Sequence, residues 1–360
     1  ETNMYGFVPY PALMRGLGSD VYIVNVGASI PYQMIDLASV PCDRHYVDGI
    51  FGTALKTGIH VGGGSTDGQL HNIQFQSWSY IGAWKYYDSI PQDTRDYVQA
   101  LLMRDATHFL FGDMTNEVVH QCFVFSADKG VHLVEENGTG PSGHCLGLGA
   151  DSCTTALRVD AVGSGGFDPI NTQLVVIDDV KGVYIETDAS LTDELRLFGC
   201  AAWGKNEYAA VFNGGTIELQ NVLLQRDGTG GTYQILNNAT VKSYGGSMDN
   251  FQSNPFLSID AGASALFAGN VLNVSAARMP ADSASVTAIG NLRMGAPADD
   301  ASTSYDAWAL AWGVDIGSDT DDYDGDLLNN FYEYAFGGDP TNGADYGRLP
   351  TLGNEDGSLF

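Results

Sequence analysis

Short apolar runs, each ended by glycine, asparagine or aspartate, fill most of this chain. The pattern predicts many brief β-strands joined by tight turns, because these three residue types tolerate the backbone conformations that turns require. Helical spacing of apolar residues occurs in two segments, 91–110 and 329–337, and Asp93 is expected to cap the first. The chain is therefore predicted to be almost entirely β.

A loose repeat occupies the second half of the β-rich region. Four similar strand-like units follow one another from about residue 183, and Ile217, Val241 and Ala265 occupy matching places 24 residues apart. A unit of this size cannot bury its own apolar face, whereas stacked units can, so the repeat predicts a solenoid. The LxxLxL frame of leucine-rich repeats is absent, and the variation in sequence from one repeat unit to the next favours a right-handed parallel β-helix. The alternative is a β-sandwich whose spacing is coincidental.

Composition narrows the possible partners. The 360 residues include 44% hydrophobic and 17% charged residues, with 16 Lys plus Arg against 44 Asp plus Glu and a formal net charge of −28. Nucleic acid and anionic membrane surfaces both demand a cationic face, so neither is an expected partner. No apolar run approaches the roughly 20 residues of a membrane span. The chain begins at Glu1, and we expect it to be a mature or excised product of a longer precursor.

Changes in the strand pattern and in the content of acidic residues divide the chain into three parts. Residues 1–280 are predicted to form the β-helix, lacking its N-terminal coils, and residues 281–307 a linker. Residues 308–360 are predicted to form an acidic segment that binds calcium. Between positions 295 and 347 there are twelve acidic residues and no Lys or Arg. The same stretch contains two tryptophans and an FYEYAF cluster, which predict an ordered part rather than a disordered tail.

The strongest motif is DYDGDLLNNFYE, residues 322–333. Calcium takes six to eight oxygen ligands, and a twelve-residue loop supplies them at positions 1, 3, 5, 7, 9 and 12. Position 6, usually glycine, is Leu327 here. The spacing predicts a structural Ca²⁺ site, the alternative being an acidic linker, with the following ligands: Asp322, Asp324, Asp326, the carbonyl of Leu328, Asn330 and Glu333.

Two resemblances to known families extend this picture. The segment DTDDYDGDLLNNFYEYAFGGDP resembles the calcium-binding segments, related to dockerin and thrombospondin type 3 loops, of secreted bacterial enzymes and surface proteins. The segments HNIQFQSW, GHCLGLGADSCTTALRVDA and LRLFGCAAWG, with VPCDRHYVDGIFGTALKTGIHVGGG before them, are similar to secreted bacterial right-handed β-helix proteins. Those proteins belong to the pectate-lyase superfamily and are often glycoside hydrolase family 55-like. The resemblance covers residues 20–280 and implies a secreted, carbohydrate-active protein.

Candidate catalytic residues are sparse. Polysaccharide-active β-helices use either two carboxyl groups or a base that removes a proton beside a uronate carboxylate. Asp113, Glu117 and His120 form the densest polar group, and Asp67 belongs to a second one. Each also has a structural interpretation, because an aspartate in a turn usually bonds its own backbone and a strand histidine is usually packed or solvated.

Aromatic residues crowd into SWSYIGAWKYYD. Trp78, Trp84 and Tyr86 are candidates for stacking on sugar rings. The alternative is a cap that closes the side of the solenoid.

Five cysteines form no CxxC pair, and Cys145 with Cys153, which flank a glycine-rich loop, are the best candidates for a bridge.

Two functional hypotheses follow. The first is a secreted glycoside hydrolase or polysaccharide lyase, in which the negative charge mildly favours a neutral glycan and hence a hydrolase. The second is a non-catalytic extracellular module for glycan binding, adhesion or assembly. Expected partners are a polysaccharide and either the remaining N-terminal part of the same precursor or further copies of this chain.

Overall fold

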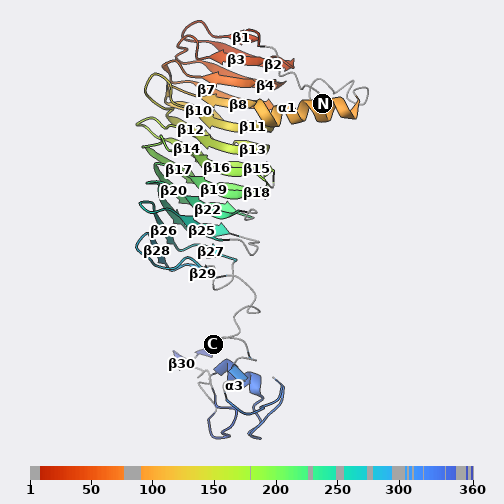
Figure 1. Cartoon of the computed structure of the whole chain (residues 1–360), viewed down its shortest axis with the longest axis vertical. Helices are drawn as coiled ribbons and strands as arrows, with labels where there is room; N and C mark the ends of the chain where they lie inside the picture. Colours follow the sequence, from red (N-terminus) through yellow and green to blue (C-terminus); the bar gives the residue numbers. More distant parts are fainter. Residues whose placement is uncertain are drawn as a thin grey trace. The chain divides into compact units, whose positions relative to one another are not determined.

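The computed structural model (Figure 1) divides into two compact units, residues 1–294 and 295–360. In the first unit it describes residues 9–76, 91–178, 180–225, 230–248, 255–273 and 279–293. In the second it describes residues 305, 308–309, 312–318, 320–336, 338–345, 354–355 and 358–359.

The first unit is a parallel β-helix of about ten turns, which confirms the predicted all-β solenoid. Each turn of the β-helix, which we call a coil, passes in chain order through three parallel sheets. We call these sheets faces A, B and C. Strands that serve face A alone are β1 (Met14–Arg15), β3 (Gln33–Leu37), β5 (Thr57–Val61), β8 (Thr107–Phe111), β16 (Val183–Thr187), β19 (Tyr208–Phe212), β22 (Gly231–Ile235) and β25 (Leu257–Ile259).

Face B is built mainly from β10 (Glu117–His120), β12 (Gly143–Leu146), β14 (Phe167–Ile170), β17 (Glu194–Phe198), β20 (Thr216–Gln220), β23 (Thr240–Tyr244), β26 (Ser264–Ala268) and β28 (Val286–Ile289). Face C contains β15 (Gln173–Ile177), β18 (Ala201–Lys205), β21 (Leu223–Leu224), β24 (Ser247–Met248), β27 (Val271–Leu272) and β29 (Leu292–Arg293).

Five longer strands bend at a corner and serve two faces. Faces B and C share β2 (Tyr22–Ser29), β4 (Tyr46–Thr53) and β7 (Gln69–Phe75). Faces C and A share β11 (Phe123–Leu133) and β13 (Gly149–Val159). The short strands β6 (Ser65–Thr66) and β9 (Met114–Thr115) pair within the turns that lead from face A to face B. We call the line of these turns the A–B edge.

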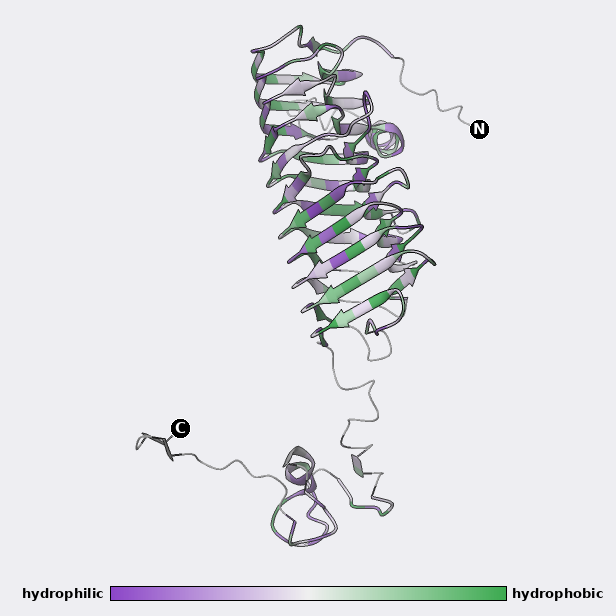
Figure 2. Ribbon diagram, turned by 90° about the vertical axis from the view of Figure 1, so that its left-hand side faces the viewer, coloured by the Kyte–Doolittle hydropathy of each residue, from purple (hydrophilic) through white to green (hydrophobic). Residues whose placement is uncertain are grey.

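The 24-residue repeat is the vertical register of face B. Ile217 of β20 pairs with Val241 of β23, which pairs with Ala265 of β26, and all three side chains are buried. Polar and apolar residues alternate along the stacked strands (Figure 2), as expected where one side faces the core. Each buried aliphatic or aromatic side chain contributes about 1.5–3 kcal/mol, so the stacked interior supplies most of the stability.

Asparagine and glycine mark the bend between faces B and C. In successive coils the corner residue has a positive φ, a conformation that these two residue types adopt at least cost. The corner residues, all asparagine or glycine except Gln121, are Asn25, Gly49, Asn72, Gln121, Gly147, Asn171, Gly199, Asn221, Gly245, Gly269 and Gly290.

An insertion between faces C and A carries the longer helix, α1 (Gln92–Asp105), which was expected from its periodicity. Its buried Leu101 and Leu102 attach it to the wall formed by β11 and β13. The N-cap is Pro91, and Asp93, the expected cap, lies in the first turn instead.

All five cysteines are buried free thiols, so the bridge suggested for Cys145 and Cys153 is not formed. Burial raises the pKa of every one of these thiols, that of Cys122 to about 12. They pack as small apolar groups in the solenoid wall.

The solenoid extends further along the chain than the sequence pattern suggested. The stretch 281–307 was expected to be a linker, but β28 and β29 add a further coil that ends at Arg293. The second unit contains α3 (Asn330–Phe336), close to the bounds expected, and a hairpin of β30 (Asn354–Glu355) and β31 (Ser358–Leu359). None of the described helices is long and apolar enough to cross a membrane.

Candidate functional site

Two predicted catalytic residues, Asp67 and Asp113, lie in neighbouring turns of the A–B edge. Asp67 itself has a positive φ of 58°, and its Oδ1 accepts a hydrogen bond from Asn116 Nδ2 at 2.7 Å. Asp113 Oδ2 accepts one from Asn137 Nδ2 at 3.0 Å. In both cases the asparagine belongs to the next coil, so the two carboxylates tie consecutive turns together.

Glu117, the third candidate, points into the solenoid. Its side chain is fully buried, and Oε1 lies 3.0 Å from Nε2 of His45, which is also fully buried. A Cβ atom at Gly68 would lie 2.3 Å from Glu117 Oε2, so the glycine provides the space that this pair occupies. Oε2 has no hydrogen-bond partner in the described part of the chain.

Electrostatics couple the two buried groups. Burial raises the pKa of Glu117, and the hydrogen bond from His45 offsets only part of that effect. Burial alone would lower the pKa of His45, but the hydrogen bond and charge of Glu117 outweigh it and raise that pKa. His45 Nδ1 lies 2.6 Å from the Cys42 carbonyl, which can only accept, so Nδ1 carries a proton. A second proton is therefore shared between Nε2 and Oε1.

His120, the fourth candidate, lies at the other end of β10 on the outer surface of face B. Its ring meets that of His71 edge-on at 5.6 Å, and His71 lies 5.4 Å from the ring of Tyr46. Tyr46 in turn lies 6.2 Å from Tyr22, whose side chain is 71% exposed. We call these four rings the ring ladder, because they come from four successive coils, with a step of two residues along the strands between Tyr46 and His71.

Polar groups flank the ring ladder. The Tyr46 hydroxyl donates to Asp48 Oδ2 at 3.3 Å, and His71 Nε2 lies 3.2 Å from Gln69 Oε1. Val118, two residues before His120 in β10, is exposed on the same surface. A row of rings that are exposed at Tyr22 and partly exposed at the other three positions, with hydrogen-bonding groups beside it, suits a ligand that is apolar on its faces and polar at its rim, as a sugar is.

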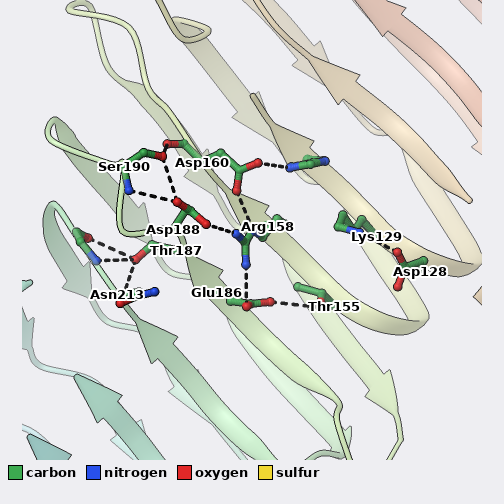
Figure 3. A network of polar contacts seen from close by, with 12 residues as sticks. Asp128, Lys129, Thr155, Arg158, Asp160, Glu186, Thr187, Asp188, Ser190 and Asn213 are labelled. Carbon is green, nitrogen blue, oxygen red and sulfur yellow. Dashed lines mark hydrogen bonds and ion pairs between the residues drawn. The ribbon is translucent and has the colours of Figure 1, made fainter. Parts of the chain in front are cut away.

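A network of ionised groups crosses three coils on face A (Figure 3). The Arg158 guanidinium contacts carboxylates of three residues, with N–O distances of 2.5–2.6 Å, namely Asp160, Glu186 and Asp188. His132 Nε2 lies 2.7 Å from the second oxygen of Asp160. Hydrogen bonds from His132 and Arg158 outweigh the burial of Asp160 and lower its pKa. A carboxylate held ionised in this way stabilises the wall and is a poor general acid.

The acidic loop gathers its carboxylates around one point. Oxygen atoms of Asp322, Asp324 and Asp326 lie within 4.8 Å of one another. Asp322 accepts backbone N–H bonds from Gly325 at 2.7 Å and Leu327 at 2.9 Å, which fold the loop around its carboxylate. Asp324 and Asp326 each keep one oxygen without a partner among the described residues.

Glu333 completes this cluster from the first turn of α3. It is 1% exposed, and neither of its carboxylate oxygens has a hydrogen-bond partner in the parts the structure describes. Burial, followed by repulsion from Asp324 and Asp326, raises its pKa to about 7. A buried carboxylate without partners is costly, and a hard divalent cation would relieve that cost. The residues at positions 1, 3, 5 and 12 therefore fit Ca²⁺.

The middle of the loop departs from the expected pattern. The side chain of Asn330, predicted as a ligand, donates through Nδ2 to the carbonyls of Ile316 at 2.7 Å and Ser318 at 2.9 Å. Its Oδ1 has no partner among the residues described, so only that oxygen could face a cation. The Leu328 N–H donates to Asp326 Oδ1 at 2.7 Å, which places position 7 beside the cluster. Leu327 adopts a φ of 79°, the conformation that glycine provides in other such loops.

Sequence reasoning missed several of these residues. Tyr22 and Tyr46 of the ring ladder, His45 and Arg158 carried no motif, and their contacts between coils join residues 24 to 72 positions apart. Trp78, Trp84 and Tyr86, the predicted sugar-stacking residues, lie outside the described residues.

No family model, no curated protein and no solved structure matches the chain.

Proposed function

We propose that this protein is an extracellular β-helix that binds a polysaccharide along face B and that this module is non-catalytic. The observation that carries the proposal is the ring ladder of Tyr22, Tyr46, His71 and His120. Tyr22 is in register with Tyr46, and His71 is in register with His120, while the ladder steps by two residues along the strands between Tyr46 and His71. Neighbouring ring centroids lie 5.4–6.2 Å apart, so the ladder offers rings at similar intervals in two adjoining columns. A linear glycan could stack on several of them at once.

Binding without hydrolysis is favoured by the placement of the carboxyl groups. Hydrolysis requires two of them about 5–10 Å apart on either side of the scissile bond. Glu117 is turned into the core, while Asp67 and Asp113 are held by asparagines of the neighbouring coil. Hydrolysis remains the alternative function, with a carboxylate pair on the A–B edge as its expected location.

The charge of the chain points to the type of glycan. With a formal net charge of −28, the protein repels polyuronates and sulfated polymers unless cations screen the negative charges. A neutral polysaccharide is therefore the proposed ligand of face B.

Affinity electrophoresis through gels that contain neutral or uronate polysaccharides tests this proposal. The wild-type chain should be retarded by at least one neutral polymer, and the double variant Tyr46→Ala, His71→Ala should migrate freely. Tyr244→Ala is the matched control, since Tyr244 lies on face B outside the ring ladder. Equal retardation of the double variant would place binding elsewhere, and release of reducing ends from the retarding polymer would establish the hydrolase instead.

We also propose that residues 322–333 bind Ca²⁺ in a structural role. The support is the burial of Glu333, which has no hydrogen-bond partner among the described residues and is repelled by the three clustered aspartates. The ion would supply the positive charge that this loop lacks, and its expected ligands are Asp322, Asp324, Asp326 and Glu333.

A further inference from the structure

Two adjoining hollows lie on the A–B edge beyond the catalytic candidates. They are formed by the turns of three consecutive coils, residues 135–140, 161–166 and 190–196, and have volumes of about 240 and 220 Å³. Ser164 and Asp193 line both. Pockets for drug-sized ligands measure about 300–1,000 Å³, so each hollow suits one small unit of a larger molecule.

Backbone and hydroxyl groups make up much of the lining. Glycines from two of the turns leave main-chain groups exposed, and Ser164, Ser190, Thr139 and Thr192 supply hydroxyls. Of these, Ser190 Oγ lies within hydrogen-bond distance of the Asp160 carbonyl and Asp188 Oδ1, and Thr192 Oγ1 donates to Asp193 Oδ2, so both can still accept from a ligand. Hydroxyls both donate and accept hydrogen bonds. Such a lining can match the many hydroxyl groups of a sugar.

The charges of the lining are unbalanced. Glu135, Asp193 and Glu194 contribute carboxylates, and the described residues give none of the three a basic partner. Arg196 is the single basic residue of the lining, and its Nε and Nη2 donate to Asp168 at 2.9 and 3.0 Å. That guanidinium is therefore already neutralised, and the hollows carry a net negative charge.

We propose that the two hollows bind a glycosyl unit that carries an amino group. Its ammonium would pair with Asp193, which borders both hollows, and with Glu135 or Glu194 on either side. Its hydroxyls would bond to the serine and threonine hydroxyls. A uronate would be repelled, and an N-acetylated unit would leave the carboxylates without a counter-charge. This inference is independent of glycan binding by the ring ladder.

The proposed ligand class can be tested with the tetramer of glucosamine as probe, in calorimetric titrations of the whole chain at low and high salt. The wild-type chain should bind it, and the affinity should fall as salt screens the charges. The double variant Glu135→Gln, Asp193→Asn should bind about tenfold more weakly, the loss expected when about 1.4 kcal/mol of charge pairing is removed. Glu207→Gln, in the turn between β18 and β19, is the matched control and should bind as the wild type does.

Further arms separate this inference from the proposed function. Ser164→Arg places a positive, bulky side chain at the wall shared by both hollows and should abolish binding even if the neutralised variant folds poorly. Tyr46→Ala, His71→Ala should leave binding of the glucosamine tetramer unchanged. Equal binding of the N-acetylglucosamine tetramer, or full binding by the Glu135→Gln, Asp193→Asn variant, would overturn the inference.

Discussion

At the residue scale, the pair of Glu117 and His45 is the most consequential feature of the interior. It joins β10 to the turn before β4 across 72 positions, and both side chains are fully buried. Breaking a buried pair by removing one partner costs about 3–5 kcal/mol, because the other is left uncompensated. We interpret Glu117 as a structural residue that orders the first coils.

The pair should give the solenoid a pH-dependent stability. Both pKa values are raised in the folded chain, so above about pH 4.3, the ordinary value of glutamate, the folded state holds more protons than the unfolded one. The free energy of unfolding should therefore be highest below that pH and fall as the pH rises through the folded-state pKa of His45. Urea unfolding at pH 4, 6 and 8 measures this slope.

Glu117→Gln tests the assignment. It should cost about 1–3 kcal/mol at pH 4 and flatten the slope, because one of the two titrating partners is gone. Glu218→Gln, on the outer surface of β20, serves as the control and should keep the slope of the wild type. An unchanged slope in Glu117→Gln would show that other groups titrate.

At the element scale, the corner between faces B and C depends on its positive φ values. Gly199 and Gly245 occupy equivalent corners, with φ of 60° and 62°. A Cβ at Gly199 would meet nothing within 4 Å, whereas one at Gly245 would lie 2.7 Å from Asn221 Oδ1.

The two glycines therefore form a matched pair of substitutions. Gly199→Ala should cost about 1–2 kcal/mol, the price of the left-handed conformation alone. Gly245→Ala should cost more, since the asparagine of the preceding coil must also move. Chemical denaturation of both variants measures the difference, and equal costs would mean that Asn221 gives way freely.

The Arg158 network should also stabilise neighbouring strands. Arg158 is 18% exposed, and Arg158→Gln leaves Asp160, Glu186 and Asp188 facing one another. We expect a loss of about 1–3 kcal/mol at low salt, shrinking as salt is added. Lys129→Gln, which breaks the single neighbouring pair with Asp128, should cost less than about 1 kcal/mol. A salt-independent loss would assign the effect to packing.

Sequence alone predicted the strands and their stacking better than the sites. The 24-residue spacing of Ile217, Val241 and Ala265 reflects the register in which successive strands pair. A register that stays constant from coil to coil appears in the sequence as a repeat of fixed period. The alternation of side chains along a strand also predicts which candidate residues can lie on the same face. Glu117 and His120 are three residues apart in one strand, so they point to opposite sides and could not share a groove. Contacts such as that of Tyr22 with Tyr46 depend on how coils align, which no local pattern records.

At the scale of the whole molecule, the two units are stabilised by different means. The solenoid, residues 1–294, has a continuous apolar core. The second unit concentrates carboxylates and buries Glu333 among them. Thermal unfolding should therefore show two transitions, and a calcium chelator should lower the midpoint of one while leaving the solenoid's unchanged. A shift of both would mean that the ion also stabilises the β-helix.

The unusual residue at loop position 6 allows a sharper test of the same site. Leu327 is 92% exposed and holds a φ of 79°, so its side chain adds strain without packing. Leu327→Gly should relieve about 1 kcal/mol of that strain and tighten calcium binding roughly fivefold in calorimetric titrations, provided the loop orders on binding. Leu327→Ala, which removes the side chain but keeps a Cβ, should bind as the wild type does, and Glu333→Gln should weaken binding sharply. If the alanine and glycine variants tightened binding equally, the exposed side chain rather than the backbone conformation would be what limits the affinity for calcium.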